Sequence, residues 1–144
     1  MKKLLTICLF IATLLVAAVN VNAKPKPIVH RGSDTSLMEG QINDDPIKMM
    51  LWTDAINGKA TGWYYYTSQG PSKKIQLSGS MKGDDMKCKL NLKEIVDGKE
   101  AGSFRGDFWR DNNGNSGFNG TWTPAKSKDK LNFEVNSSSP GPNN

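Results

Sequence analysis

Few side chains in this sequence are placed to act as an acid, a base or a nucleophile. The only histidine, His30, lies in a stretch that we predict to be an extended arm, so no imidazole base is held in position. Asp44, Asp45, Asp84 and Asp85 fall in predicted turns, where aspartate is favoured because its side chain hydrogen-bonds the local backbone. We therefore predict no catalytic residue and a protein that is not an enzyme.

Glu94 is the one carboxylate with a different placement. It alternates with Leu90 and Leu92, so it shares the inward face of a predicted strand. The predicted strand pairing sets it opposite Lys73, near one end of the sheet. This placement predicts an ion pair at the rim. The alternative is a ligand contact or a general acid, in which case the protein is a hydrolase-like enzyme centred on Glu94.

One loop has a partial calcium-binding pattern. Asp111, Asn113 and Asn115 occupy the first three ligand positions of such a loop. Ser116 stands where the loop needs glycine, and Trp122 stands where it needs a bidentate glutamate. We interpret the segment as a hairpin loop. Because the sequence has neither a histidine-rich nor a multi-cysteine cluster, it predicts no metal site and no cofactor.

The elements that position these residues are predicted from an alternation of glycine with large apolar residues, as in Phe104-x-Gly106-x-Phe108. Positions two apart lie on one face of a strand, so glycine and bulk share a buried side. No segment has a convincing helical period. We predict strands at residues 36–43, 46–54, 59–67, 73–82, 85–96, 100–110, 116–123 and 130–136.

The predicted fold is all-β: a single eight-stranded antiparallel up-and-down meander that forms a closed or nearly closed small barrel. A sandwich or an open, curled sheet is the alternative. An outer-membrane barrel is disfavoured because it needs an apolar outer face. The face opposite the predicted core carries instead Lys48, Lys74, Gln76, Lys87, Lys89, Asn91, Lys93, Arg105 and Asp107.

Turn residues predict the strand pairing in the first half of the barrel. We expect turns at Asp44-Asp45, Asn57-Gly58, Gly70-Pro71 and Gly83-Asp84. Cys88 then points into the core and is expected to be a buried, inert thiol. The inward pairs that these turns predict are Ile42 with Ile47, Leu51 with Tyr64, Met49 with Tyr66, Gly62 with Gly79, and Gly79 with Cys88.

Apolar matching predicts the pairing in the second half. A three-residue loop at 97–99 sets Leu92 opposite Phe104, whereas a two-residue turn would set it opposite Ser103. We therefore predict the longer loop. The further pairs are Lys89 with Asp107, Phe108 with Phe118, Gly106 with Gly120, and Trp122 with Leu131.

The strands at 46–54 and 59–67 are apolar on both faces. The predicted register sets Trp52 opposite Trp63 and Met50 opposite Tyr65 on the outer face, with Leu37 beside Trp52. Such a strand pair is either covered or binds something. The covering candidate is the arm at 24–35, and the binding candidates are a partner protein, a second copy of the chain or a glycan. We predict an exported, non-enzymatic binding protein that acts through Met50, Trp52, Trp63 and Tyr65.

The barrel interior is the alternative binding site. Glycine alternating with aromatic residues can leave a cavity, so the second predicted function is a carrier of a small apolar ligand. Because the inward residues are bulky, a filled core is the expected arrangement. The residues that would line a cavity are Tyr64, Tyr66, Glu94, Phe104, Phe108 and Trp122.

The N-terminal sequence is typical of a secretory signal peptide at 1–23. Lys2 and Lys3 precede an apolar run over 4–18, and Val21-Asn22-Ala23 forms a small-residue cleavage site. The run is shorter than the ~20 residues of a membrane span. We expect an extended arm at 24–35, a barrel domain at 36–136 and a disordered tail at 137–144. The protein is expected to be exported and soluble, in the periplasm or outside the cell.

The charge balance gives little support to a nucleic acid partner. The chain has 19 basic and 14 acidic residues, a net charge of +5. Removal of Lys2 and Lys3 with the signal peptide leaves 17 basic residues against the same 14, or +3. No basic run alternates with stacking aromatic residues along a groove, so we expect no nucleic acid binding.

Five short motifs follow one another along the predicted strands: Gly62-Trp63-Tyr64-Tyr65-Tyr66, Ile75-x-Leu77-x-Gly79, Leu90-x-Leu92-x-Glu94, Gly102-x-Phe104-x-Gly106 and Gly120-x-Trp122. Through these motifs, most of residues 36–136 resembles small secreted bacterial proteins of unknown function. The resemblance implies a strand architecture and no known site. In shape alone, the predicted barrel is also loosely similar to avidin and the lipocalins.

Overall fold

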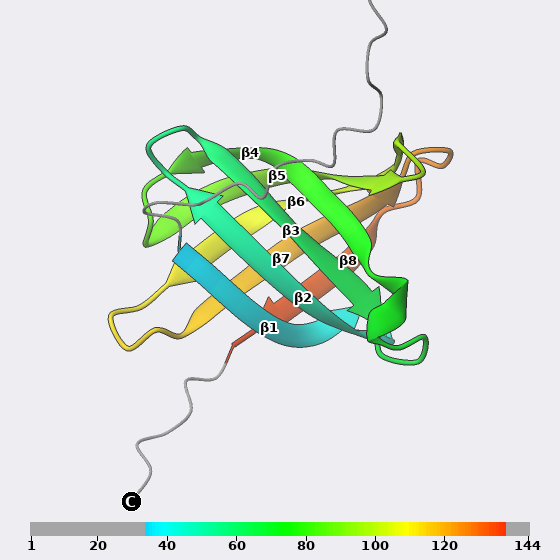
Figure 1. Cartoon of the computed structure of the whole chain (residues 1–144), viewed down its shortest axis with the longest axis horizontal. Helices are drawn as coiled ribbons and strands as arrows, with labels where there is room; N and C mark the ends of the chain where they lie inside the picture. The colour runs from blue at the N-terminus through cyan, green and yellow to red at the C-terminus, as the bar shows by residue number, and fades with distance from the viewer. Residues whose placement is uncertain (1–33, 138–144) are drawn as a thin grey trace, which may run out of the picture.

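The alternating apolar residues form eight strands in a computed structural model that describes residues 34–137. The strands pair in up-and-down order and close into a barrel, β8 with β1 (Figure 1). The predicted all-β meander and its closure are confirmed. The strands are β1 (Asp34–Ile42), β2 (Asp45–Asp54), β3 (Lys59–Tyr66), β4 (Ile75–Gly83), β5 (Lys87–Val96), β6 (Lys99–Arg110), β7 (Ser116–Pro124) and β8 (Leu131–Asn136), with a 3₁₀ turn η1 (Pro71–Lys73) before β4.

The barrel begins two residues earlier than predicted, because Asp34 and Thr35 already pair with Thr53 and Trp52. The predicted signal peptide, the rest of the predicted arm and the tail beyond Ser137 lie outside the described residues. Within residues 34–137 no helix has the length and apolar character that a membrane crossing requires.

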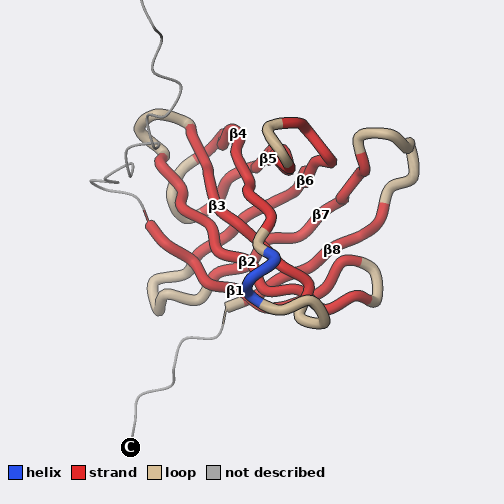
Figure 2. The backbone as a smooth tube through the Cα atoms, turned by 45° about the vertical axis from the view of Figure 1, so that its right-hand side comes forward, coloured by secondary structure: helices blue, strands red, loops and turns tan. Residues whose placement is uncertain are grey.

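The inward faces of all eight strands form one hydrophobic core. Four aromatic rings are less than 2% exposed, namely Tyr64, Phe104, Phe108 and Phe118. Cys88 is buried and free, as predicted. Figure 2 shows that the loops gather at the two ends of the barrel. One end carries the loops at 43–44, 67–74, 97–98 and 125–130, and the other carries those at 55–58, 84–86 and 111–115.

The predicted register of the second half is confirmed: Leu92 lies opposite Phe104, Phe108 opposite Phe118, and Trp122 opposite Leu131. The predicted three-residue loop between β5 and β6 is wrong. The turn is the two-residue Asp97-Gly98, and both residues have positive φ as such a hairpin turn requires. A bulge between Glu94 and Ile95 then shifts the register by one residue and restores the apolar pairs.

The predicted registers of the first four hairpins are wrong, each by an even number of residues. Leu51 lies opposite Gly62 and not Tyr64, and Met49 lies opposite Tyr64 and not Tyr66. Even shifts keep every side chain on its predicted face. Between β1 and β2, Ile47 lies opposite Gly40 and not Ile42. Between β3 and β4, Gly62 lies opposite Leu77 and Gly79 opposite Ala60, so the two glycines do not face each other. Between β4 and β5, Gly79 lies opposite Leu92 and Cys88 opposite Gly83, so Gly79 does not face Cys88.

Aspartate side chains explain two of these shifts. Asp54 accepts hydrogen bonds from the backbone N–H of Asn57 at 3.1 Å and from its Nδ2 at 2.7 Å, which stabilises a four-residue loop. Asp84 accepts in the same way from the N–H groups of Met86 and Lys87. An Asx turn competes with the tight two-residue hairpin, so these two loops are longer than the two-residue turns that the Asn-Gly and Gly-Asp signals predict.

Gly106 and Gly120 face each other across β6 and β7, as predicted. A Cβ on Gly106 would lie 1.8 Å from the carbonyl oxygen of Asn119, and one on Gly120 would lie 2.1 Å from that of Arg105. Glycine is therefore required for the close approach of the two backbones. Such kinks let a sheet coil tightly enough to close into a small barrel.

Candidate functional site

The four predicted surface residues Met50, Trp52, Trp63 and Tyr65 all lie on the outer face of β2 and β3, and each is partly exposed. We call this set the outer aromatic surface. The predicted cross-strand pairs are wrong: Trp63 lies opposite Met50, while Trp52 lies opposite Thr61. Tyr65 lies opposite Lys48, whose Nζ is 2.6 Å from a carboxylate oxygen of Glu39. Leu37 was predicted beside Trp52 on the preceding strand; it lies directly opposite Met50, while Thr35 lies opposite Trp52.

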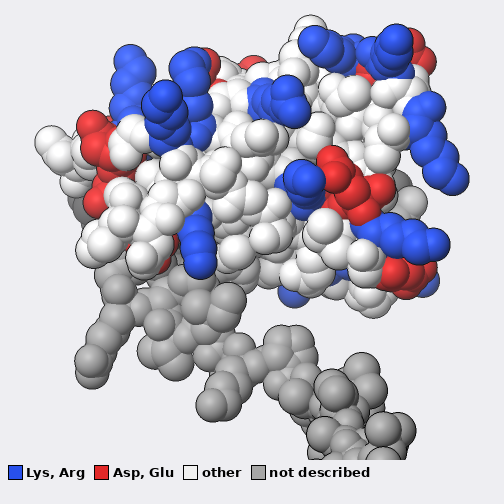
Figure 3. All heavy atoms as spheres, turned by 90° about the horizontal axis from the view of Figure 1, so that it is seen from above, with Lys and Arg blue, Asp and Glu red and all other residues white. Residues whose placement is uncertain are grey.

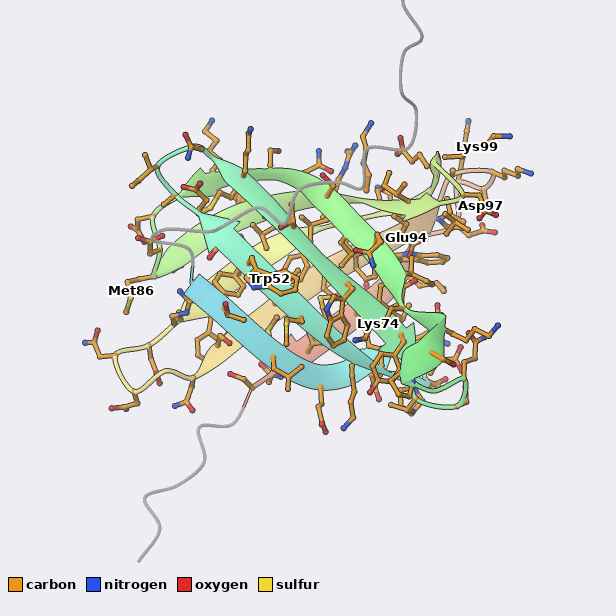
Figure 4. The ribbon with its side chains drawn as sticks, viewed as in Figure 1. Trp52, Lys74, Met86, Glu94, Asp97 and Lys99 are labelled. Atoms are coloured by element: carbon orange, nitrogen blue, oxygen red, sulfur yellow. The ribbon has the colours of Figure 1, made fainter. Side chains whose placement is uncertain are left out.

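Trp63 is held in place by two neighbours. Its ring stacks on that of Tyr65, with centroids 5.9 Å apart and planes 23° from parallel. The Nζ of Lys74 lies 4.1 Å from the Trp63 ring centroid, a cation–π contact. Lys74 immediately precedes β4, so the η1 turn at 71–73 delivers this ammonium to the aromatic surface. Figure 4 shows Trp52 and Lys74 on the same face of the barrel.

A groove of about 520 Å³ adjoins these rings on the outer face of β2–β5. Trp52 supplies an aromatic wall, and Gln76 connects the groove to Trp63, which it directly opposes. Short hydroxyl side chains on β3 and β4 leave the floor low. We call this the Trp52 groove, and its lining residues are Trp52, Thr61, Gly62, Gln76, Leu77, Ser78 and Ile95.

The sequence predicted the aromatic members of this site and missed its polar members. Thr61, Gln76 and Ser78 come from strands whose register was predicted wrongly, so nothing in the sequence placed them beside Trp52. Lys74 was predicted to lie on the solvent-exposed face, and this prediction is correct. The predicted cover by residues 24–35 falls almost wholly outside the described residues and stays a prediction.

Glu94 lies inside the barrel and not in a rim ion pair with Lys73, so that expectation is wrong. It lies opposite Leu77 and Gly102, and it is 3% exposed. Oε1 accepts a hydrogen bond from the Tyr64 hydroxyl and another from Trp122 Nε1 at 2.5 Å. Figure 4 shows Glu94 toward the end of the barrel that carries Asp97 and Lys99.

Two features of β6 make room for this carboxylate. A Cβ on Gly102 would lie only 2.7 Å from Glu94 Oε2, so a side chain at that position would collide with it. The bulge beside Glu94 adjusts the pairing at the same point. Burial raises the pKa of the Glu94 carboxyl, whereas the hydrogen bonds from Tyr64 and Trp122 lower it; burial has the larger effect. Burial beside Glu94 also raises the pKa of Tyr64.

The raised pKa of Glu94 predicts a pH-dependent stability difference between the wild type and Glu94→Gln. A carboxyl whose pKa is higher in the folded state stabilises the fold below its unfolded value of about 4.3, and this contribution is lost as pH rises through the folded value. We therefore expect the wild type to lose stability relative to Glu94→Gln as pH rises above about 4. Urea unfolding from pH 4 to 8 measures this, and parallel pH curves for the two proteins would contradict it.

Two of the other predicted interior residues, Tyr64 and Phe104, belong to a packed column of aromatic rings. Tyr64 meets Phe104 edge to face at a centroid distance of 5.2 Å, and Phe104 meets Phe133 at 4.9 Å. Tyr66 contacts Tyr64 at 5.7 Å and is partly exposed near the barrel end. Phe108 lies farther along the barrel, where the Arg110 guanidinium is 5.5 Å from its ring centroid.

Two further residues singled out in the sequence, Asp111 and Cys88, have structural roles. Asp111 Oδ2 accepts a hydrogen bond from the Asn115 side-chain amide, and Oδ1 accepts from the backbone N–H groups of Asn113 and Asn115. These hydrogen bonds, that of the Asn115 side chain above all, lower the pKa of the Asp111 carboxyl. Burial raises the pKa of the Cys88 thiol to about 11, which keeps it protonated at neutral pH. Within residues 34–137 no group of three or more His, Cys, Asp or Glu side chains is arranged to hold a metal ion.

Comparison of this sequence and structure with known proteins identifies no relative. No protein-family model matches the sequence, and neither the curated proteins nor the solved structures contain a significant match. A function for this chain therefore has to be inferred from the geometry of the outer aromatic surface and of the interior carboxylate.

Proposed function

We propose that this protein is an exported, non-enzymatic binding protein that recognises a glycan through the Trp52 groove and the adjoining outer aromatic surface. The observation that carries the proposal is the groove of about 520 Å³, in which an indole faces hydroxyl and amide side chains. Its volume is in the range of small-molecule sites, which combine apolar walls with a few placed polar groups. Export is inferred from the signal-peptide pattern of residues 1–23.

The lining chemistry favours a glycan over a protein partner. A sugar ring presents C–H groups that pack on an aromatic ring and hydroxyls that exchange hydrogen bonds with Thr61, Gln76 and Ser78. A stable protein contact needs about 800 Å² from each partner and an apolar centre. Here Thr61 and Ser78 lie between Trp52 and β5, and Gln76 lies between Trp63 and β5, which suits a narrow ligand.

The interior supports neither of the other two functions as well. A carrier of an apolar ligand needs space where Tyr64, Phe104 and Phe133 pack edge to face. A hydrolase centred on Glu94 needs a carboxyl that reaches a substrate, whereas Glu94 is 3% exposed and accepts hydrogen bonds from Tyr64 and Trp122.

Trp52→Ala and Trp63→Ala test the proposal. Each is expected to weaken glycan binding at least about tenfold, since loss of an aromatic anchor typically removes more than about 1.4 kcal/mol of binding energy. Binding is measured on an array of neutral and acidic oligosaccharides and then by calorimetry.

Leu131→Ala is the control, because Leu131 is a large apolar side chain 36% exposed on β8, which lines neither the groove nor β4 and β5. It should bind like the wild type, and all three variants should unfold cooperatively near the wild-type Tm. The proposal fails if no glycan on the array binds, or if the Trp52→Ala and Trp63→Ala proteins both bind every glycan as tightly as the control does.

A further inference from the structure

Lysines occupy four outward positions on β4 and β5, next to the Trp52 groove. They are Lys82 on β4 and Lys87, Lys89 and Lys93 on β5, and we call them the basic strip. Lys82 lies directly opposite Lys89, and Lys93 lies opposite the groove residue Ser78. Figure 3 shows one face of the molecule, on which lysine and arginine side chains project among uncharged residues and several acidic side chains.

Only part of this charge is neutralised. Lys89 Nζ lies 2.7 Å from Asp107 Oδ1, and Lys93 Nζ lies 3.0 Å from Glu100 Oε2. Lys82, Lys87 and the neighbouring Arg105 form no ion pair with any residue that the structure describes. Like charges set directly across a strand pair are destabilising. A surface with uncompensated cations attracts anionic ligands and raises their local concentration.

The strip and the groove form one continuous path along β4. Ser78 lines the groove, and Lys82 lies four residues farther along the same outer face, roughly 13 Å away. A second hollow, of about 470 Å³, lies at that end and is lined by Lys82, Lys87, Cys88, Lys89 and Asp107. Between the two hollows the outward side chains are the short, uncharged Ser80 and Asn91.

We propose that the ligand is an acidic polysaccharide, a chain of sugar rings that carry carboxylate or sulfate groups. This inference rests on the proposed glycan-binding function. One sugar ring packs on Trp52 in the groove, and the chain follows the outer face of β4. Its anionic groups reach Lys82, Lys87 and Lys89 at the second hollow, while Ser80 and Asn91 hydrogen-bond ring hydroxyls on the way.

The path suits a polysaccharide better than a single-stranded nucleic acid. Proteins that bind single-stranded nucleic acids without sequence preference stack successive bases on aromatic side chains. Here the rings lie only at the two extremes, Trp52 beside the first hollow and Trp109 opposite Lys87 at the second. The intervening positions carry no ring on which a base stacks.

The double variant Lys82→Gln plus Lys87→Gln tests the proposal in the full chain, because both lysines are exposed and unpaired with described residues. Polygalacturonate supplies carboxylates and heparin supplies sulfates, with dextran as the neutral polymer. We expect the wild type to bind at least one acidic polymer, more weakly at about 200 mM than at about 50 mM salt. The double variant should bind that polymer about tenfold more weakly and with a shallower salt dependence.

Lys126→Gln plus Lys128→Gln is the matched control, since it removes the same charge from the loop between β7 and β8. It should bind like the wild type. Equal binding by the two double variants overturns the inference, as does a single-stranded DNA or an anionic lipid vesicle that binds as tightly as the acidic polymer. Trp52-dependent binding of neutral sugars alone overturns the inference and leaves the proposed function standing. Absence of binding to every sugar polymer and oligosaccharide overturns both.

Discussion

Glu94→Ala is expected to lower the free energy of unfolding by about 2–4 kcal/mol. The substitution removes the acceptor of the buried Tyr64 hydroxyl and of the partly buried Trp122 indole N–H, and a donor left buried without a partner costs about 1–3 kcal/mol. Removal of the carboxylate also relieves the cost of burying an acid, so the net loss stays below what two donors and a cavity alone would give. Urea unfolding followed by tryptophan fluorescence measures the change.

Two variants isolate the role of the hydrogen bonds in this loss. Glu94→Gln keeps an acceptor oxygen at the position of Oε1 and should lose at most about 1 kcal/mol, the net contribution of an ordinary hydrogen bond. Glu134→Ala removes an exposed glutamate from β8 and should change stability by less than about 0.5 kcal/mol. A Glu94→Ala protein as stable as the Glu134→Ala control would show that the two donors find other partners.

Gly106→Val is expected to have the second large effect, a loss of more than about 4 kcal/mol, at the upper extreme for a single substitution. The first side-chain atom would lie 1.8 Å from a backbone oxygen and 2.7 Å from a backbone carbon of Asn119. Because the obstacle is backbone, relief requires β6 and β7 to separate where Gly106 faces Gly120. The barrel then loses ladder hydrogen bonds along with the aromatic contacts of Phe104 and Phe118.

Thermal unfolding followed by circular dichroism measures this loss, with Gly106→Ala as a milder variant that carries the methyl group alone. Gly98→Asn is the control, because Gly98 has a φ of +74° in an open turn with nothing within 4 Å of its Cβ position. Asparagine tolerates that conformation, so the control should lose little stability. A Gly106→Val protein whose Tm lies within about 5 °C of the wild type would contradict the assigned role of this close approach.

The fold was predictable from the sequence because the signal that defines it is local. Alternation along each segment assigns an inner and an outer face, and this assignment survives any even shift in pairing. For this reason Cys88 and Glu94 are buried, and Trp52, Trp63 and Tyr65 lie outside, although four of the predicted registers are wrong. Closure followed from the number of strands and the exposed edges that an open sheet would leave.

The partners of the site residues were not predictable in the same way. Register depends on the length of each turn, and Asp54 and Asp84 lengthen two turns through side-chain hydrogen bonds that compete with the Asn-Gly and Gly-Asp signals. The shift of four residues between β4 and β5 removed Glu94 from Lys73 and set it opposite Leu77. The shift of two between β2 and β3 separated Trp52 from Trp63.

Local pattern in the amino-acid sequence was enough to establish that this chain forms eight alternating strands, which face of each strand is buried, and that an aromatic set remains outside. Assembly of the barrel was needed to bring Thr61, Gln76 and Ser78 beside Trp52 in a groove, and to let Tyr64 and Trp122 reach one oxygen of Glu94. The physical reason is that the two properties depend on interactions of different range along the chain. A side chain's face is set by its own strand's pleat, whereas its neighbours are set by turn lengths and by closure of β8 on β1.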